Sequence, residues 1–198
     1  YEGVEITGEG SVGLITYMRT DSLRISEEAL AAAGDVIKSR YGAAYYPGAP
    51  RRYKPKSSAQ DAHEAIRPSN VALYPELVEH DLTKDQFRLY KLIWSRFIAS
   101  QMENAVYDVT AIEAACGEHV FRATHQSLRF AGFTAIYEEG RDDEQEEVLS
   151  ALPDLAQGEA LNLKKTDPQQ HFTQPPARYT EATLVRAMEE KGVGRPST

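Results

Sequence analysis

The chain has 198 residues, 41% of them hydrophobic, and a formal net charge of −8. This composition supports a buried core, while apolar runs that are short and interrupted by charge exclude a membrane-spanning helix. The single cysteine, Cys116, excludes an internal disulfide, and no Cys-x-x-Cys pair is present to hold zinc, so we expect a cytoplasmic protein.

The opening residues, Tyr1 to Val4, contain neither an initiator methionine nor a basic segment followed by an apolar stretch. They therefore do not form a signal peptide. We expect the chain to begin within a longer polypeptide.

Residues 1–103 carry two strong helix signals. Ser26 is placed to cap a helix that has acidic residues in its first turn and ends near Gly42. Thr83 and Gln86 form a capping box, and large apolar residues then recur at helical spacing as far as Ile98. Such a stripe is typical of core packing, so we predict a mostly helical domain over residues 1–103.

The stretch between these two helices is rich in proline, tyrosine and basic residues. Arg51, Arg52, Lys54 and Lys56 surround Tyr53, a mixture that suits a nucleic-acid surface. A solvated basic loop is the alternative interpretation of such a run taken alone.

The negative net charge does not exclude DNA as a partner, because the acidic residues are concentrated in one place. Residues 138–147 hold seven acidic residues and one arginine, so they account for −6 of the total of −8. This segment has no apolar period and is interpreted as a solvated loop, to which we assign no function.

Residues 104–172 have the pattern of antiparallel strands. Polar and apolar residues alternate from Val106 to Ile112, and Gly117-Glu118 marks a turn into a second strand, Val120 to Thr124. We predict a β-rich portion over this range.

Residues 173–198 have the pattern of a linker and the start of another helical unit. Pro175-Pro176 marks the linker, and Thr180 caps a helix that ends at Gly192. The predicted fold class is therefore α+β: a mostly helical, winged-helix-like domain followed by the antiparallel β-rich portion.

The segment from Gly13 to Ser22 begins as an apolar strand and carries a candidate nucleophile. If it stays extended through Arg19, then Tyr17 and Arg19 project from the same face. A tyrosine phenol has an ordinary pKa of about 10, so a nucleophilic tyrosine benefits from a nearby cation, and arginine also binds phosphate oxygens. The alternative is a packed ring beside an exposed charge, which spacing alone favours.

Three segments resemble motifs of the bacterial type IA DNA topoisomerases, in the order of that family. Gly13 to Ser22 is similar to the active-site segment, Gln60 to Pro68 to the histidine motif, and Gly192 to Thr198 to a DNA-contacting motif. The resemblance extends over the whole chain and implies an ATP-independent enzyme. It also implies that the β-rich residues 104–172 are a gate or hinge portion whose sheet is incomplete and has an exposed edge, and that the unit beginning in residues 173–198 binds DNA. An enzyme of this family cleaves single-stranded DNA through a 5′-phosphotyrosine, passes a strand and reseals the break, which relaxes negative supercoils.

The resemblance also implies roles for individual residues. Tyr17 is the expected nucleophile, Arg19 would orient the scissile phosphate, and His63 would contact the phosphate or order the site. The His-Glu pair lacks the second histidine of a zinc protease, since Arg67 stands there, so no metal site is implied. The expected DNA-binding residues are Thr16, Arg51, Arg52, Lys54, Arg195, Ser197 and Thr198.

Nothing in the sequence resembles the family's TOPRIM domain, which the resemblance implies as a partner in the same polypeptide. That domain would supply a general acid and the ligands of Mg²⁺, so we expect the metal to bind outside this chain and the isolated chain to be inactive. Two alternatives stay open at this stage: a noncovalent winged-helix-type DNA-binding module, and a β-rich half that serves only as a protein-interaction or hinge module.

Overall fold

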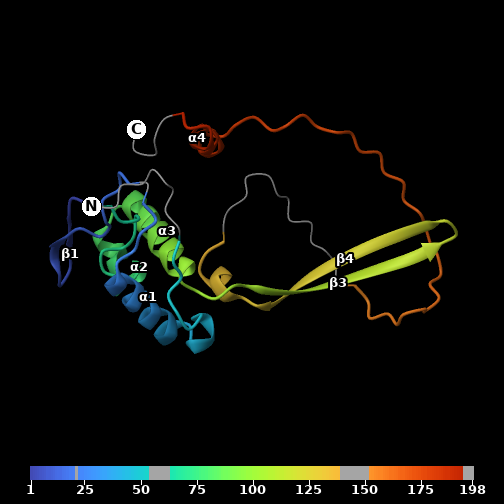
Figure 1. Cartoon of the computed structure of the whole chain (residues 1–198), viewed down its shortest axis with the longest axis horizontal. Coiled ribbons are helices and arrows are strands. Elements are labelled where there is room, and N and C mark those ends of the chain that lie inside the picture. The colour runs from blue at the N-terminus through green and yellow to red at the C-terminus, as the bar shows by residue number, and fades with distance from the viewer. Residues whose placement is uncertain (21, 54–62, 139–151, 194–198) are drawn as a thin grey trace.

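The computed structural model describes residues 1–20, 22–53, 63–138 and 152–193. Figure 1 shows the first three helices gathered in one body, a long two-stranded ribbon that extends away from it, and a last helix at the end of an extended segment. The α+β class predicted from the sequence is confirmed. Within the described ranges, no helix is long and apolar enough to cross a bilayer.

Helix α1 (Glu27–Arg40) begins where the sequence predicts it. The Ser26 hydroxyl accepts a hydrogen bond from the Ala29 N–H, with the acidic Glu27 and Glu28 in the first turn. Both features stabilise the positive end of the helix dipole. One face of α1 is buried, and Ala33 and Ile37 are fully excluded from solvent.

Helix α3 (Lys84–Ser100) provides the other half of the core, and the predicted capping box of Thr83 and Gln86 is confirmed. Its stripe of Tyr90, Trp94 and Phe97 is buried in one core cluster with Val78 of the shorter helix α2 (Pro75–Val78). Two 3₁₀ helices, η1 (Ala43–Tyr45) and η2 (Glu79–Asp81), follow α1 and α2 in the chain. The Trp94 indole N–H donates to the Val71 carbonyl at 3.0 Å, and the Tyr90 hydroxyl donates to Leu73. Burial raises the pKa of Tyr90.

A short antiparallel hairpin, which the sequence did not reveal, precedes the helices. It consists of β1 (Val4–Ile6) and β2 (Gly10–Val12), with Val4 opposite Val12. Its turn is fastened to η2, because the backbone N–H and the hydroxyl of Thr7 both donate to the Asp81 carboxylate, at 2.9 and 2.8 Å. This attachment holds the start of the chain against the helical body.

The attachment of the hairpin should depend on pH through Asp81. The hydrogen bonds from the Thr7 N–H and hydroxyl lower the pKa of Asp81 from its usual 3.8, and His80 adds a smaller effect in the same direction. Because the folded pKa is the lower one, Asp81 stabilises the fold above pH 3.8, and this contribution disappears as the pH falls through the folded value. We expect Asp81→Asn to be less stable than the parent at neutral pH, with the difference vanishing in acid. Urea unfolding of both proteins from pH 7 to pH 2 measures this, and a difference that stays constant would contradict it.

The ribbon consists of β3 (Val106–Cys116) and β4 (His119–Phe130), which pair antiparallel around a turn at Gly117-Glu118. The predicted hairpin is confirmed, although β4 is longer than expected. Most apolar side chains on the ribbon are exposed, including Val109, Val120 and Phe121. The two strands therefore form an incomplete sheet, as predicted, with unpaired edges on both sides within the described residues.

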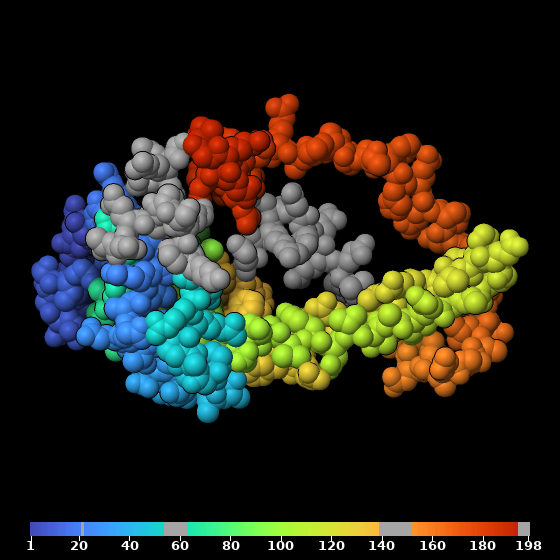
Figure 2. Space-filling model, viewed as in Figure 1, coloured from blue at the N-terminus to red at the C-terminus, as the bar shows by residue number. Residues whose placement is uncertain are grey.

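The prediction of strands as far as residue 172 is wrong. Residues 152–180 contain no regular element in the described part of the chain, and Figure 2 shows them as a thin, extended chain that curves back toward the last helix. A strand persists only where a neighbour satisfies its backbone hydrogen bonds, and Pro153 and Pro168 cannot donate any. Alternating leucines such as Leu161 and Leu163 thus stay exposed.

The ribbon is joined to the helical body through a tight backbone contact. Gly132 has a φ of +49°, and a Cβ atom there would lie 2.4 Å from the backbone of Asn104. Beside this contact, the Phe133 N–H donates to the Glu103 carbonyl and the Glu103 N–H donates to that of Tyr45. Only glycine fits this position, since it combines a left-handed conformation with no side chain.

Helix α4 (Glu181–Glu190) confirms the last predicted element. Thr180 caps its start, and Gly192, with a φ of +69°, follows its end. There, the N–H groups of Gly192 and Val193 donate to Glu189 and Met188, which is the Schellman pattern. The apolar side chains of Leu184, Val185 and Met188 are exposed.

Candidate active site around Tyr17

Tyr17 lies at the surface on a segment that is anchored on its N-terminal side. Leu14 is buried in the core, and Ile15 forms an antiparallel bridge with Pro68. The Tyr17 side chain itself is 43% exposed. The phenol is therefore accessible to a large substrate while the backbone just before it is fixed.

The anchor is the segment that contains the histidine motif, and we call residues 63–69 the histidine strap. The Leu14 carbonyl accepts from the Ser69 N–H at 3.0 Å, and the Thr16 N–H donates to the Arg67 carbonyl at 3.0 Å. The Ser69 hydroxyl also donates to the Gly13 carbonyl. Two segments far apart in sequence are thus joined as a short, irregular pair of strands.

This pairing brings His63 beside Tyr17. The two rings meet edge to face with centroids 6.5 Å apart, and on another side the Tyr1 ring meets Tyr17 in the same manner at 5.2 Å. His63 is half-buried, so the imidazole is held at the edge of the exposed phenol. The contact joins two of the three residues to which the family resemblance assigns catalytic roles, and the role of His63 stays a prediction.

Arg19 does not lie on a continuous strand with Tyr17. The chain bends at Met18 and Arg19, so the condition under which Tyr17 and Arg19 would share one face of a strand is not met. The pairing with the strap ends at Thr16, and beyond it the Thr20 hydroxyl accepts from the Ser22 N–H in a local turn. Arg19 is exposed, and within the described ranges it forms no hydrogen bond or cation–π contact with Tyr17. Its proposed role as a phosphate ligand stays a prediction.

The described part of the basic stretch is already paired with protein groups. Arg52 forms two hydrogen bonds with the Glu27 carboxylate at 2.6 and 2.8 Å, which lower the pKa of Glu27. Arg51 pairs with Glu103 at 3.2 Å. A DNA phosphate would have to displace these carboxylates. Lys54 lies outside the described residues, as do Arg195, Ser197 and Thr198, so their predicted contacts stay predictions.

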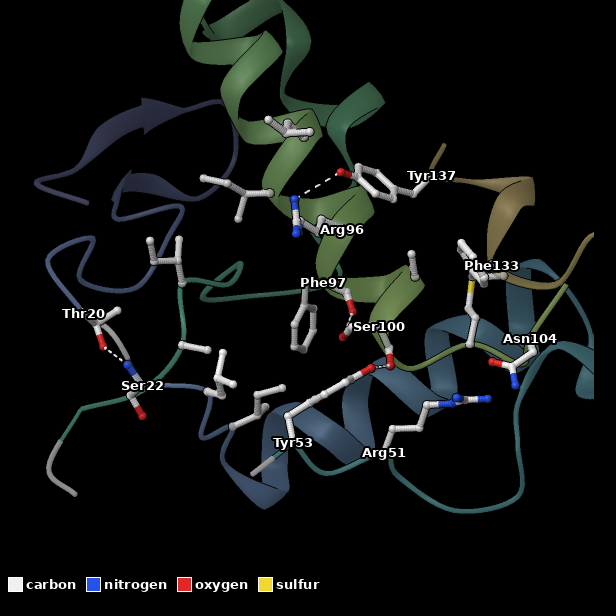
Figure 3. Close-up of a pocket in the computed structure, with 18 of the residues that line it drawn as sticks. Thr20, Ser22, Arg51, Tyr53, Arg96, Phe97, Ser100, Asn104, Phe133 and Tyr137 are labelled. Carbon is white, nitrogen blue, oxygen red and sulfur yellow. Dashed lines mark hydrogen bonds between the residues drawn. The ribbon is translucent and has the colours of Figure 1, made fainter. Parts of the chain in front are cut away.

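A groove of about 790 Å³ opens beside the segment that follows Tyr17. Figure 3 shows it between the turn at Thr20 and Ser22, the side of α3 that carries Arg96 and Phe97, and the aromatic Tyr137. The Arg96 guanidinium donates to the Tyr137 hydroxyl at 3.2 Å. The lining is mainly apolar, which makes it unsuited to hold a metal ion.

Across the described residues, no group of three or more His, Cys, Asp and Glu side chains could hold a metal ion. Glu64, the carboxylate adjacent in sequence to His63, is committed to Arg67 at 2.7 Å. The described residues therefore offer no donor set that fits Mg²⁺.

Sequence reasoning missed three features of this site. They are the edge contact of the Tyr1 ring with Tyr17, the hydrogen bonds of the Thr16 hydroxyl to Ala65 and Arg67, and the Glu64–Arg67 ion pair. Only the ion pair joins residues close in sequence, since Glu64 and Arg67 are oppositely charged and three apart.

The comparison with known proteins gives the class to which this fold and site belong. The sequence model of the DNA topoisomerase family matches residues 1–198, so the chain belongs to that family. Within the family, the chain is similar to full-length topoisomerase I from Thermotoga maritima, with 36% sequence identity and a TM-score of 0.77. The resemblance to the bacterial type IA enzymes is thereby confirmed.

The similarity covers 100% of this chain and 31% of the Thermotoga maritima chain. The chain thus spans about a third of the length of that protein.

Proposed function

We propose that this chain carries the nucleophile of a type IA DNA topoisomerase and that Tyr17 is that nucleophile. In the first step, the phenol oxygen forms a bond to the phosphorus of a single-stranded DNA phosphodiester, and the bond to the 3′ oxygen breaks. The phenol loses its proton and the leaving 3′ oxygen gains one. Passage of another strand and the reverse attack by the 3′ hydroxyl restore the DNA. One phosphate ester replaces another in each step, so no ATP is needed.

The observation that carries this proposal is the combination of access and anchoring at Tyr17. The ring is 43% exposed, while the preceding residues are fastened to the strap that holds His63. A nucleophile must approach phosphorus along a defined line, and a fixed backbone beside an accessible phenol allows this. Arg19 and His63 are proposed to bind the phosphate oxygens and to stabilise the charge that develops on them.

Other parts of the reaction are proposed to come from elsewhere in the polypeptide. The described residues offer no acidic group beside Tyr17 that is free to protonate the 3′ oxygen, since Glu64 is paired with Arg67. We propose that the TOPRIM domain supplies the general acid and binds Mg²⁺, which would offset phosphate charge when bound. Negatively supercoiled DNA is the proposed substrate because it opens readily into single strands.

The alternative of a noncovalent DNA-binding module has less support. Its proposed phosphate surface includes Arg51 and Arg52, and both guanidinium groups are paired with carboxylates, those of Glu103 and Glu27.

The proposal is tested in the intact topoisomerase with Tyr17→Phe, which keeps the ring and its edge contacts and removes only the hydroxyl. A single-stranded oligonucleotide is labelled at its 3′ end, incubated with protein and Mg²⁺, and separated on a denaturing gel. We expect the parent to retain the label as a covalent adduct and Tyr17→Phe to lose the adduct entirely while still binding the oligonucleotide. With a 5′ label, a shortened free product is expected instead.

Tyr107→Phe is the matched control, because Tyr107 is also 43% exposed but lies on the ribbon. It should form the adduct at the parental level. An adduct that persists in Tyr17→Phe would refute the assignment of the nucleophile. Binding without any adduct in the parent would instead support the noncovalent module.

A further inference from the structure

The residue before the proposed nucleophile makes an unusual set of contacts. The Thr16 hydroxyl donates a hydrogen bond to the Ala65 carbonyl at 2.9 Å and accepts one from the Arg67 N–H at 3.0 Å. Its backbone N–H also donates to the Arg67 carbonyl at 3.0 Å. A hydroxyl has a single proton to donate, so the donor of Thr16 is already used inside the protein.

These contacts reach the histidine strap next to its functional end. Ala65 is two residues from His63 and Thr16 is adjacent to Tyr17, so the Thr16 hydroxyl joins the two segments close to both rings. The Ala65 N–H is bonded in turn to the Arg24 carbonyl at 2.8 Å, on the segment that leaves the active site. The strap is therefore held from both sides of Tyr17.

The strap is also stiffened internally by Arg67. Its guanidinium donates to Glu64 Oε2 from Nη2 at 2.7 Å and from Nε at 3.2 Å, and to the Pro68 carbonyl from Nη1 at 2.9 Å. The Arg67 side chain is only 13% exposed. With its donors directed inward, Arg67 is a structural cation of the strap and not a ligand for DNA.

We propose that Thr16 is a positioning residue: its hydroxyl, together with the Arg67–Glu64 pair, fixes the spacing between His63 and Tyr17. This inference rests on the proposed function, and it replaces a direct contact between Thr16 and DNA. A direct contact that used the donor of Thr16 would release Ala65 and loosen the strap. The Thr16 hydroxyl does not touch the reacting atoms. It acts on the reaction only by placing the His63 imidazole relative to Tyr17.

The experiment compares Thr16→Val, which keeps the shape but removes both side-chain hydrogen bonds, with Thr16→Ser, which keeps the hydroxyl. Both are made in the intact topoisomerase, with His63→Ala and the double variant Thr16→Val/His63→Ala. The rate of adduct formation is measured at saturating oligonucleotide, and affinity is measured in the Tyr17→Phe background. We expect Thr16→Val to lower the rate about 10- to 100-fold, as small misplacements of reacting groups do. Affinity should not change, and Thr16→Ser should restore most of the rate.

The double variant decides between positioning and direct contact. If Thr16 acts through His63, the double variant should be no slower than His63→Ala alone. The inference would be overturned if the rate losses of the two single variants multiply in the double variant. It would also be overturned by a parental rate in Thr16→Val or in His63→Ala, or by a weaker affinity of Thr16→Val with an unchanged rate. If Thr16→Val fails to fold, Arg67→Met carries the test, and a parental rate in that variant would overturn the inference as well. The Tyr17→Phe variant distinguishes the proposed nucleophile from the proposed role of Thr16. If the adduct is lost in Tyr17→Phe but forms at the parental rate in Thr16→Val, only the role of Thr16 is refuted.

Discussion

The isolated 198-residue chain is expected to form no covalent adduct with single-stranded DNA, even in the presence of Mg²⁺. A phenol attacks as a phenolate, and an ordinary tyrosine is almost fully protonated at neutral pH because its pKa is about 10. The described neighbours of Tyr17 are two rings, those of Tyr1 and His63. General acid catalysis typically contributes about 10²- to 10⁴-fold, and the nearby Glu64 is engaged by Arg67.

This expectation is checked by supplying the TOPRIM-containing part of the enzyme as a separate protein. The chain is incubated with 3′-labelled oligonucleotide and Mg²⁺, alone and together with the TOPRIM-containing part of the same topoisomerase, with Tyr17→Phe as the control. An adduct that appears only in the mixture, and only with Tyr17 present, is the expected result. A clear adduct from the chain alone, lost in Tyr17→Phe, would show that the chain is catalytically self-sufficient.

Replacing Trp94 with alanine is expected to lower the free energy of unfolding of the helical body by about 3–5 kcal/mol, the range for large aromatic residues in cores. Trp94 is 2% exposed, its indole N–H bonds to the Val71 carbonyl at 3.0 Å, and its ring meets Tyr74 at 5.7 Å. The substitution removes all three contributions and leaves the Val71 carbonyl without its partner. A loss of this size is a large part of the stability of a small domain.

The measurement is urea unfolding followed by circular dichroism, with Leu92→Ala as the control on the same helix. Leu92 is 50% exposed, so its removal should change the unfolding free energy by no more than about 0.5 kcal/mol. Equal losses in the two variants would contradict the assignment of the α3 stripe as the centre of the core.

Features that depend on residues close in sequence could be predicted correctly. The caps at Ser26, Thr83 and Thr180 each satisfy donors within one turn, so a few adjacent residues determine them. The turn at Gly117-Glu118 is local in the same way. The three capped helices and the hairpin of the ribbon therefore lie where the sequence predicts them, whereas the short helix α2 was not predicted.

Features that depend on distant partners could not be predicted. The three-residue strands β1 and β2 are too short to show alternation, and the link between Thr7 and Asp81 joins two separate regions. The proximity of His63 to Tyr17 was expected from the family resemblance alone, because no pattern within either segment specifies their pairing. The use of the Thr16 hydroxyl inside the protein followed from neither source.

The tight contact between Gly132 and Asn104 has a consequence for how this chain can vary in evolution. The ribbon leaves and re-enters the helical body at adjacent points, because Asn104 and Gly132 are in contact. A change in the length of the ribbon therefore does not move its attachment to the body. Facing pairs such as Thr110 and His125 can be added or deleted two at a time without inverting the faces of the strands, since side chains alternate with a period of two. The length of the ribbon can therefore differ between homologues without a change in the geometry around Tyr17.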